Sequence, residues 1–357
     1  MTASNTIRRP GTARKREASA ELVGASKTLP LVTIAVLCFN NVDIIDGCLR
    51  GIKEVEYLNI ECLLIDDCST DNTAEYVKDK YPWIKVITKS SNSGIGTSRN
   101  VAISNAKGKY ILFHDSDAVM FPKYLDSSIR LLENHPDIAI VGSKLLSISD
   151  RTVLDQAGGN YYKFGFGKDR GKGMAPSSFD KQEEVFFVGG AAQLARMGIF
   201  DVIGDYDATT GIYGCEDVDM SWRARLAGFR VVYNPNSVGA HGYHTTVKKL
   251  PSSTVLFNSQ KAHIRMLIKN FGLLNLVTFL PIAFVVSLGD ITFFPEARYA
   301  KLRAWTWNVK NLKGTLSERA KVQGIRRVKD SDIERYFSHD LTKIVLAKLK
   351  LFFGNAR

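Results

Sequence analysis

Cysteine is scarce in this sequence of 357 residues, which has only five: Cys38, Cys48, Cys62, Cys68 and Cys215. Their number is odd and no two are separated by just two residues, which argues against a disulfide framework and against a zinc site built on paired cysteines. Unpaired thiols suit a reducing compartment, and the basic N-terminus lacks the apolar stretch of a secretory signal. We therefore expect a cytoplasmic protein.

The middle of the sequence has no net positive charge. The net charge is +12, of which residues 1–30 carry +4 and residues 291–357 carry +9, so the residues between them sum to −1. A nucleic-acid groove would place its charge on the folded body, so we expect no nucleic-acid partner. Basic ends suit an anionic membrane surface instead. With 45% hydrophobic and 24% charged residues, the chain is not predominantly disordered.

Apolar, β-branched runs alternate with helical patterns in the first third of the folded region. Strands are predicted at residues 31–37, 60–65, 84–87 and 110–113, with helices at 42–56, 71–80 and 94–106 between them. This alternation predicts an open, mostly parallel sheet covered by helices. Ligands bind beyond the carboxyl ends of such strands, where Asp66, Asp67, Asp115 and Asp117 stand.

Strands are also expected at residues 138–141, 184–194 and 231–233, and helices at 123–134 and 216–227. The stretch 155–180 is rich in glycine, lysine and aromatic residues and predicts a mobile loop. Within it, residues 158–173 are a candidate lid or acceptor-binding loop.

Two acidic motifs follow predicted strands. Asp115 and Asp117 are two residues apart after a buried strand, where they can share a hard divalent cation such as Mg²⁺ or Mn²⁺. Two acids in a turn are otherwise commonly just solvated. Asp66 and Asp67 can accept hydrogen bonds from a base or a ribose, although turn formation and helix capping by Ser69 and Asp71 explain the same residues.

A glycine-rich motif covers residues 94–100, with Gly94, Gly96 and Arg99. The glycines allow close approach of backbone to a ligand, and the Arg99 guanidinium can bind phosphate or carboxylate. A dinucleotide-binding motif would have glycine at position 99 and would follow the first strand rather than the third. A Rossmann-type dehydrogenase is therefore disfavoured.

A third acidic motif opens the helix predicted at residues 216–227. Glu216, Asp217 and Asp219 stand where a helix N-terminus favours the ionised carboxylate, and such a group in a cleft can act as a general base. The alternative is a capping cluster in which Asp219 pairs with Arg223 one turn later. His241 is a further candidate, either a metal ligand beside the acid pair or an ordinary polar residue.

Taken together and in this order, the motifs resemble the family-2 inverting glycosyltransferases of the GT-A fold. The resemblance extends from about residue 31 to about residue 270 and is carried by residues 32–40, 64–71, 94–100 and 216–230, with Asp115, Asp117 and His241. Residues 216–230 look most like the rhamnosyltransferase-like branch, whose members build cell-surface polysaccharides and glycolipids.

The resemblance implies a role for each motif. Asn40, Asp67 and Arg99 would contact the nucleotide, and Asp115 the ribose or the metal. Asp117 and His241 would be metal ligands for Mg²⁺ or Mn²⁺ on the donor diphosphate. Asp217 would deprotonate the acceptor hydroxyl, with Glu216 as the competing choice. Trp222 and Arg223 would support the site.

The resemblance also implies the architecture and the reaction. We expect a disordered basic tail at 1–30, a GT-A catalytic domain at 31–260 and a helical, basic region at 261–357 that associates with a membrane. The donor would be a nucleotide-diphosphate sugar and the acceptor a glycan or a lipid-linked hydroxyl. The alternatives are a metal-dependent nucleotidyltransferase and a non-catalytic, membrane-associated scaffold on a transferase fold; the oligomeric state is left open.

The C-terminal third contains an uncharged run at residues 271–288 with basic residues on both sides. It is shorter than the ~20 residues that cross a bilayer, Pro281 interrupts it, and Asp290 ends it. A helix lying in the membrane interface is the leading interpretation, ahead of a buried core helix and a true span. The basic flanks and the neighbouring Trp305 and Trp307 favour the cytoplasmic membrane face.

Overall fold

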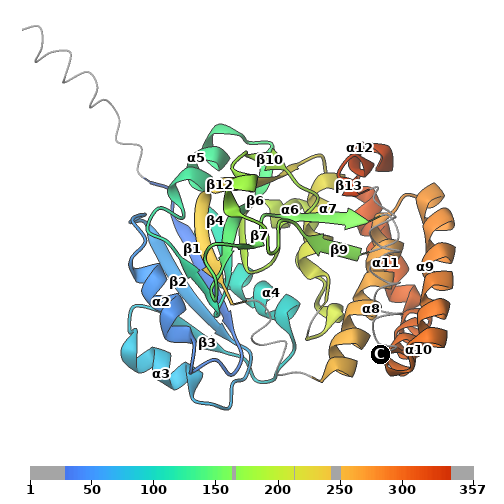
Figure 1. Ribbon diagram of the computed structural model, residues 1–357, viewed down its shortest axis with the longest axis horizontal. Coiled ribbons are helices and arrows are strands. Elements are labelled where there is room, and N and C mark those ends of the chain that lie inside the picture. The colour runs from blue at the N-terminus through green and yellow to red at the C-terminus, as the bar shows by residue number, and fades with distance from the viewer. Residues whose placement is uncertain (1–28, 163–165, 213, 243–250, 339–357) are drawn as a thin grey trace, which may run out of the picture. The chain divides into compact units, whose positions relative to one another are not determined.

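The fold is built around a mixed sheet in which parallel strands dominate the N-terminal half (Figure 1). The computed structural model describes residues 29–162, 166–212, 214–242 and 251–338, so the expected tail at 1–30 lies almost entirely outside them. The strands are β1 (Val32–Cys38), β2 (Ile60–Asp66), β3 (Lys85–Thr88), β4 (Tyr110–Asp115), β5 (Ala118–Met120), β6 (Ile138–Ser147), β7 (Leu154–Gln156), β8 (Gly159–Tyr162), β9 (Phe166–Asp169), β10 (Glu183–Glu184), β11 (Ala192–Arg196), β12 (Arg230–His241) and β13 (Phe337–Ser338).

Helices follow most of the strands. They are α2 (Ile45–Lys53), α3 (Thr73–Lys80), α4 (Ile95–Asn105), α5 (Asp126–Asn134), α6 (Ile199–Ile203), α7 (Glu216–Leu226), α8 (Ser252–Asn270), α9 (Leu273–Phe293), α10 (Pro295–Lys310), α11 (Leu312–Gly324) and α12 (Asp330–Glu334), with single 3₁₀ turns at η2 (Pro176–Phe179) and η3 (Ala208–Thr210). The alternation predicted for residues 31–117 is confirmed, since β1, α2, β2, α3, β3, α4 and β4 follow in that order.

Strands β1 to β4 are parallel and lie in the order β4-β1-β2-β3. In this register Leu37 of β1 lies beside Ile65 of β2 and Asp115 of β4, so the three carboxyl ends meet at one edge of the sheet. Side chains alternate between the two faces because successive residues of a strand point to opposite sides. One face packs on α2, α3 and α5, and the other packs on α4, α6 and α7.

The second half of the sheet is mixed. Strand β11 runs antiparallel between β4 and β6, and β12 runs parallel to β6. The short β5 pairs antiparallel with the end of β12, which places His241 opposite Ala118. This pairing brings the end of β12 back to the edge where β4 ends. The GT-A class of fold expected from the resemblance is confirmed in this mixed, mostly parallel sheet and its C-terminal helices.

The stretch 155–180, expected to be a loop, contains regular structure. Within it β8 pairs with β9, and β13 from the far end of the described chain completes a three-stranded sheet. Its aromatic residues supply the reason, because the ring of Tyr161 is fully buried and stacks on Phe186 with centroids 4.8 Å apart. Residues 163–165 of the candidate lid lie outside the described chain.

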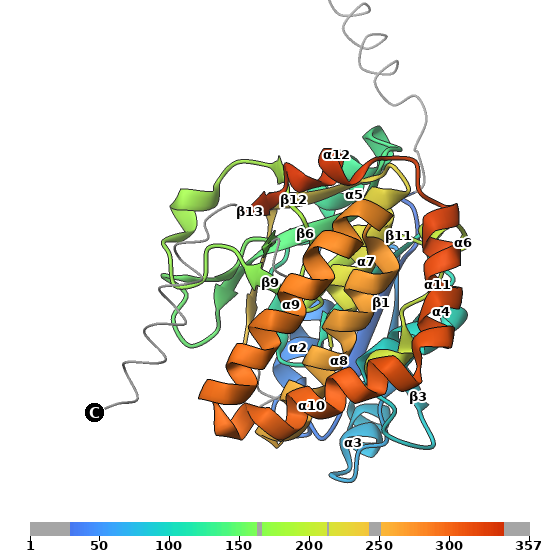
Figure 2. The same ribbon diagram turned by 90° about the vertical axis from the view of Figure 1, so that its right-hand side faces the viewer.

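Helices α8 to α11 form a layer beside α7 (Figure 2). The expected domain boundary at residue 260 falls inside α8, and from Leu31 onward the described chain forms one compact unit. Helix α9 continues through both residues expected to limit it. Pro281 is exposed and costs the helix one hydrogen bond, and Asp290 is paired with Lys301 of α10.

Candidate active site

A cleft opens at the carboxyl edge of the parallel strands, where the sheet topology gathers the predicted acidic motifs. Its lining includes Asp67 after β2, Asp115 and Asp117 around the end of β4, and Glu216 and Asp217 at the start of α7. His241, Arg99 and Asn41 line it as well. Residues from six separate parts of the chain therefore meet in one cleft, whereas Asn40 is not part of the lining.

Three side chains at the end of β4 and β12 form a set that can hold a metal ion. The ligand atoms of Asp115, Asp117 and His241 all lie within 4.8 Å of one another. Nε2 of His241 is 3.3 Å from Oδ1 of Asp117 and 3.9 Å from Oδ2 of Asp115. Two carboxylates and one imidazole suit Mn²⁺ or Mg²⁺, which can keep open positions for phosphate oxygens. The donor set fits the divalent cation that the fold implies.

Asp155, the middle residue of β7, orients the imidazole. Its Oδ2 lies 2.8 Å from Nδ1 of His241, which leaves Nε2 directed at Asp115 and Asp117. Such a carboxylate behind a metal-binding histidine fixes the ring and its tautomer. Burial lowers the pKa of His241, but its bonds to Asp117 and Asp155 outweigh this and raise the pKa to about 10. Without a cation the imidazolium itself therefore balances the charge of these acids, and a cation that binds replaces that proton.

Asp67 organises the backbone before α4. Its Oδ1 and Oδ2 each accept a hydrogen bond of 3.0 Å, from the backbone N–H groups of Ser93 and Gly94, and Nζ of Lys89 lies 2.7 Å from Oδ1. The carboxylate thus lines the cleft while it holds the glycine-rich motif against the end of β2.

Asn40 and its neighbour Asn41 have different positions. Asn40 has a left-handed backbone, with φ of 53°, and its side-chain oxygen accepts from the backbone N–H of Thr70 at 2.8 Å. Asn41 is fully buried, lines the cleft, and accepts a 2.9 Å hydrogen bond from the hydroxyl group of Ser116. Of the two, Asn41 is the one that the structure places in the cleft.

Arg99 links α4 to α7 inside the cleft wall. Its guanidinium is buried, lies over the rings of Phe113 and Tyr206, and donates to Oε1 of Glu216 at 2.9 Å. A Cβ atom at Gly190 would lie 1.9 Å from its Nη2 atom, so glycine is needed there. Arg99 therefore acts first as the partner of a buried carboxylate.

Glu216 and Asp217 differ in their surroundings. Burial raises the pKa of Glu216 to about 7 against the opposing effect of Arg99, and its Oε2 atom is buried without a hydrogen-bond partner. Asp217 is more open to solvent, and its two oxygens accept from the backbone N–H groups of Gly190 at 3.0 Å and Val218 at 2.8 Å. Burial raises the pKa of Asp217 too, while Arg99 lowers it. Of the two carboxylates, Asp217 is the more accessible to a hydroxyl group in the cleft, which a general base has to reach.

The third acid of this motif points elsewhere. Asp219 pairs with Arg223 at 2.9 Å, as the capping alternative predicts, and does not line the cleft. Trp222 is buried in a core formed with Tyr161, Phe186 and Phe271. Both residues thus support α7 from behind rather than face a ligand.

Besides Asn41, the polar residues of the cleft that were not predicted from the sequence include Asp155, Gln156 and Asp169. Asp155 and Gln156 lie on β7, and Gln156 donates to Asp169 of β9. Burial raises the pKa of Asp169 to about 6. The sequence holds a signal for Asp155 and Gln156, because these two polar residues follow apolar ones just before a pair of glycines. Strand β9, which carries Asp169, has no recognisable signal in the sequence.

Comparison with known proteins agrees with this geometry. Residues 33–201 match the sequence model of the family described as Glycosyl transferase family 2. Glycosyltransferase GlyG of Streptococcus pneumoniae is 27% identical over 143 residues, which are 39% of this chain and 45% of that protein. The chain thus spans less than half the length of the first curated relatives that it matches.

Two solved structures share the fold. The structure of GalNAc-T7 with UDP, GalNAc and Mn²⁺ matches with a TM-score of 0.57 and 15% identity, over 82% of this chain and 58% of that chain. Mannosyltransferase PcManGT from Pyrobaculum calidifontis, in complex with GDP-Man and Mn²⁺, matches with a TM-score of 0.50 and 16% identity, over 87% and 92%. At these identities the likeness concerns the fold alone.

Proposed function

We propose that the chain is a family-2 glycosyltransferase that transfers a sugar from a nucleotide-diphosphate sugar to a hydroxyl group, because residues 33–201 match the sequence model of that family. The observation that carries the proposal is the shared cleft, in which a metal-binding set of Asp115, Asp117 and His241 lies with the candidate base Asp217. A metal site and a base in one cleft are what a displacement at an anomeric carbon next to a diphosphate requires.

Each residue has a part in this reaction. Asp115, Asp117 and His241 would hold the cation, and a bound cation offsets the charge that develops on the leaving diphosphate. The Mn²⁺ in the structures of both GalNAc-T7 and PcManGT supports manganese as that cation. Asp67 and Asn41 lie near the end of the cleft formed by β1 and β2, where a nucleoside would be bound.

Asp217 would accept the proton of the acceptor hydroxyl as its oxygen attacks the anomeric carbon from the face opposite the diphosphate. The C–O bond to the diphosphate breaks as the new C–O bond forms, so the configuration inverts in one displacement. Glu216 stays with Arg99 and helps fix the N-terminus of α7. More specifically, we propose that the chain belongs to the rhamnosyltransferase-like branch. Its acceptor would then be a hydroxyl group used in polysaccharide, glycolipid or glycoprotein synthesis.

A thermal-shift panel tests the proposal. UDP, dTDP, GDP and CDP are each added with and without Mn²⁺ or Mg²⁺ to wild type, to Asp117→Ala and to Asp79→Ala, an exposed acid on α3. At about a hundred times its Kd, the correct nucleotide should stabilise wild type and Asp79→Ala by about 2.7 kcal/mol, but only with the cation. Asp117→Ala should show no cation-dependent shift.

The same panel separates the alternatives. If no nucleotide shifts wild type, the scaffold interpretation gains and the transferase proposal fails. With the matching nucleotide sugar and a mixture of glycan acceptors, release of nucleoside diphosphate supports a glycosyltransferase. Release of pyrophosphate from a nucleoside triphosphate would support a nucleotidyltransferase instead.

We further propose that α9 docks the protein on the cytoplasmic surface of an anionic bilayer. Among the described residues, Leu273–Thr292 is one helix apolar and long enough to cross a membrane, with a mean hydropathy of 1.9 and 11% of that window buried. Leu274, Val277 and Val285 are exposed at 80%, 64% and 64%, on a helix whose other side packs on α8 and α10. A core helix does not fit this exposure, whereas an interfacial helix does.

Charge supports a bilayer as the partner. The exposed Arg303, Lys310 and Lys313 follow on α10 and α11, and Trp305 donates to the hydroxyl group of Ser287 on α9 at 3.0 Å. An exposed apolar helix followed by exposed basic residues suits the interface of a membrane with anionic lipid. A surface-bound enzyme would meet a lipid-linked acceptor directly.

Replacing one exposed leucine tests this docking. In flotation with vesicles of phosphatidylcholine and phosphatidylglycerol, Leu274→Glu should lower lipid binding roughly tenfold, because a charge replaces an exposed leucine that would insert into the bilayer. Leu58→Glu is the matched control, since Leu58 is 85% exposed between α2 and β2. Equal binding of both variants, or a wild type that does not float, would contradict membrane docking.

A further inference from the structure

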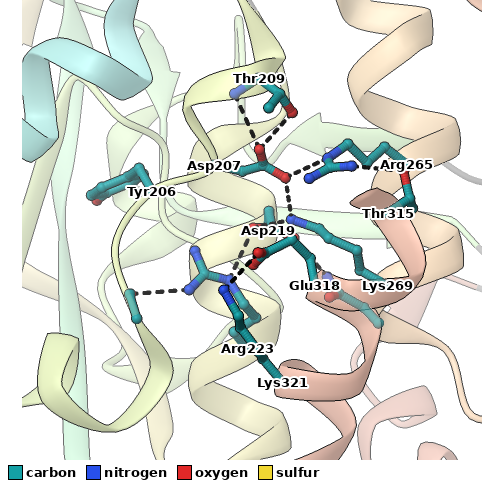
Figure 3. Close-up of polar contacts among 12 residues, drawn as sticks. Tyr206, Asp207, Thr209, Asp219, Arg223, Arg265, Lys269, Thr315, Glu318 and Lys321 are labelled. Atoms are coloured by element: carbon teal, nitrogen blue, oxygen red, sulfur yellow. Dashed lines mark hydrogen bonds and ion pairs between the residues drawn. The ribbon is translucent and has the colours of Figure 1, made fainter. Parts of the chain in front are cut away.

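A buried cluster of charges joins α8 to the segment that leads into the candidate active site (Figure 3). Two cations of α8, Arg265 and Lys269, are 5% and 4% exposed. They reach two acids outside the C-terminal helices, Asp207 before η3 and Asp219 on α7. None of these four residues lines the cleft, so the mechanism above does not use them.

Lys269 contacts both acids. Its Nζ atom is 2.6 Å from Oδ2 of Asp207 and 3.2 Å from Oδ2 of Asp219. Arg265 binds the same oxygen of Asp207 through Nε at 2.8 Å and donates to Thr315 of α11 at 2.6 Å. One ammonium group therefore connects two points of the chain that are separated by η3 and the first turn of α7.

Each acid is also tied into its own element. Asp207 accepts from the backbone N–H of Thr209 at 3.1 Å and so caps η3. Asp219 accepts from Nε of Arg223 at 2.9 Å and from Nδ2 of Asn270 at 3.0 Å. A displacement of the Asp207 carboxylate would therefore be transmitted to η3, and a displacement of the Asp219 carboxylate to α7.

The segment between the two acids carries the cleft residues. Ile212, Glu216 and Asp217 belong to it, and all three line the cleft. Gly211 lies against Gly94, where a Cβ on Gly94 would be 2.1 Å from the Gly211 carbonyl oxygen. Residue 213 of this segment is outside the described chain.

The charges explain why the bridge holds. Burial raises the pKa of Asp207 and Asp219, but Lys269 and the neighbouring arginines outweigh it and hold both pKa values below their ordinary range. Both acids are thus carboxylates at neutral pH. Without Lys269, the buried carboxylates of Asp207 and Asp219 would have less positive charge between them. Their mutual repulsion would then be costly, because the surroundings have a low dielectric constant.

We propose that Lys269 is a positioning residue for sugar transfer, which fixes Asp217 and Ile212 in the cleft by holding Asp207 and Asp219 at one ammonium group. The inference rests on the proposed function. It assigns the helical layer a part in catalysis that is separate from membrane docking, since Lys269 is buried on the side of α8 that faces α7 and η3.

The test compares Lys269→Met with Lys301→Met. Lys301 is also a buried lysine paired with one aspartate, Asp290, but it joins α10 to α9 far along the chain from the cleft residues. Steady-state transfer from the nucleotide sugar identified by the panel is measured well below the Tm of each variant. Both substitutions should lower the Tm, because each removes the ammonium partner of a carboxylate, buried in the case of Lys269 and half-buried in the case of Lys301.

Lys269→Met should also lower kcat by about tenfold or more with little change in KM for the donor, because a small displacement of a catalytic group is costly. Lys301→Met should keep the kcat of wild type, and Lys269→Arg should recover part of the loss. If Lys269→Met does not fold, Asp207→Asn, which keeps the shape of the side chain, should lower kcat in the same direction.

Other results overturn the inference. Wild-type kcat in Lys269→Met, or an equal loss in Lys301→Met, shows a merely structural role while the transferase proposal stands. Absence of any transfer by wild type removes the proposed function, and this inference with it.

Discussion

Asp217→Asn is expected to lower kcat by about 10³-fold while cation-dependent nucleotide binding stays at the wild-type level. General-base catalysis by a positioned group is worth about 10²–10⁴-fold, and asparagine cannot accept the proton. The amide oxygen can still accept the hydrogen bond from Gly190, whereas the bond from Val218 is lost because the amide nitrogen cannot accept it, so a modest loss of Tm is expected as well. Steady-state transfer and a nucleotide thermal shift on the same preparation measure the two effects.

Glu216→Gln is the comparison that decides between the two acids. Glutamine leaves the buried Arg99 without a charged partner, so we expect a lower Tm but a smaller loss of kcat than in Asp217→Asn. A larger loss in Glu216→Gln would make Glu216 the base. Burial raises the pKa of Asp217, and the base must be ionised to accept a proton. The kcat/KM of wild type should therefore fall as the pH drops through this raised pKa, which lies above the usual range of aspartate. Asp217→Asn should not show this fall at low pH.

Gly94→Ala is expected to destabilise the fold by about 2–5 kcal/mol and to reduce transfer. The backbone of Gly94 has φ of 90° and ψ of 168°, a conformation essentially confined to glycine, which costs another residue about 1–3 kcal/mol. Its Cβ would also lie 2.1 Å from the carbonyl oxygen of Gly211, so the backbone there would have to move. Overpacking of this kind costs about 1–3 kcal/mol. The N–H of Gly94 binds Asp67, so the same movement reaches the nucleoside end of the cleft.

Gly173→Ala separates the two causes. Gly173 has a similar φ of 74°, but a Cβ there meets nothing within 4 Å. Urea unfolding should therefore show only the conformational cost of about 1–2 kcal/mol in Gly173→Ala, with transfer unchanged. Equal destabilisation in both variants would mean that the contact between Gly94 and Gly211 contributes nothing.

The N-terminal half of the fold could be predicted because its physical signals are local. Runs such as residues 31–37 are continuously apolar since both faces of β1 are buried, and a glycine or an acid marks each following turn. The segment 155–180 could not be predicted. Its strands are short, and one of them pairs with β13, whose sequence lies far away along the chain.

The candidate site was predictable where a motif follows a strand, as at Asp115 and Asp117. The partners of those residues were not, because they depend on side-chain orientation across the sheet. Asp155 reaches His241 only through the register of β7 and β12 on either side of β6. Arg99 was expected to bind a ligand, whereas in the structure its guanidinium pairs with Glu216. This pairing depends on the packing of α4 beside α7, which a local sequence pattern does not reveal.

The small sheet β13-β8-β9 also sets an order of events during synthesis. Its outer strand β13 leaves the ribosome long after β8, and Phe337 of β13 packs on Tyr161 and Phe186 in the core beside α7. The nascent parallel strands can form their core early, whereas the neighbourhood of Asp169 is completed only by β13, which is translated much later. A growing chain that still lacks β13 is therefore a sheet without a finished cleft, so the proposed sugar transfer would await the synthesis of β13.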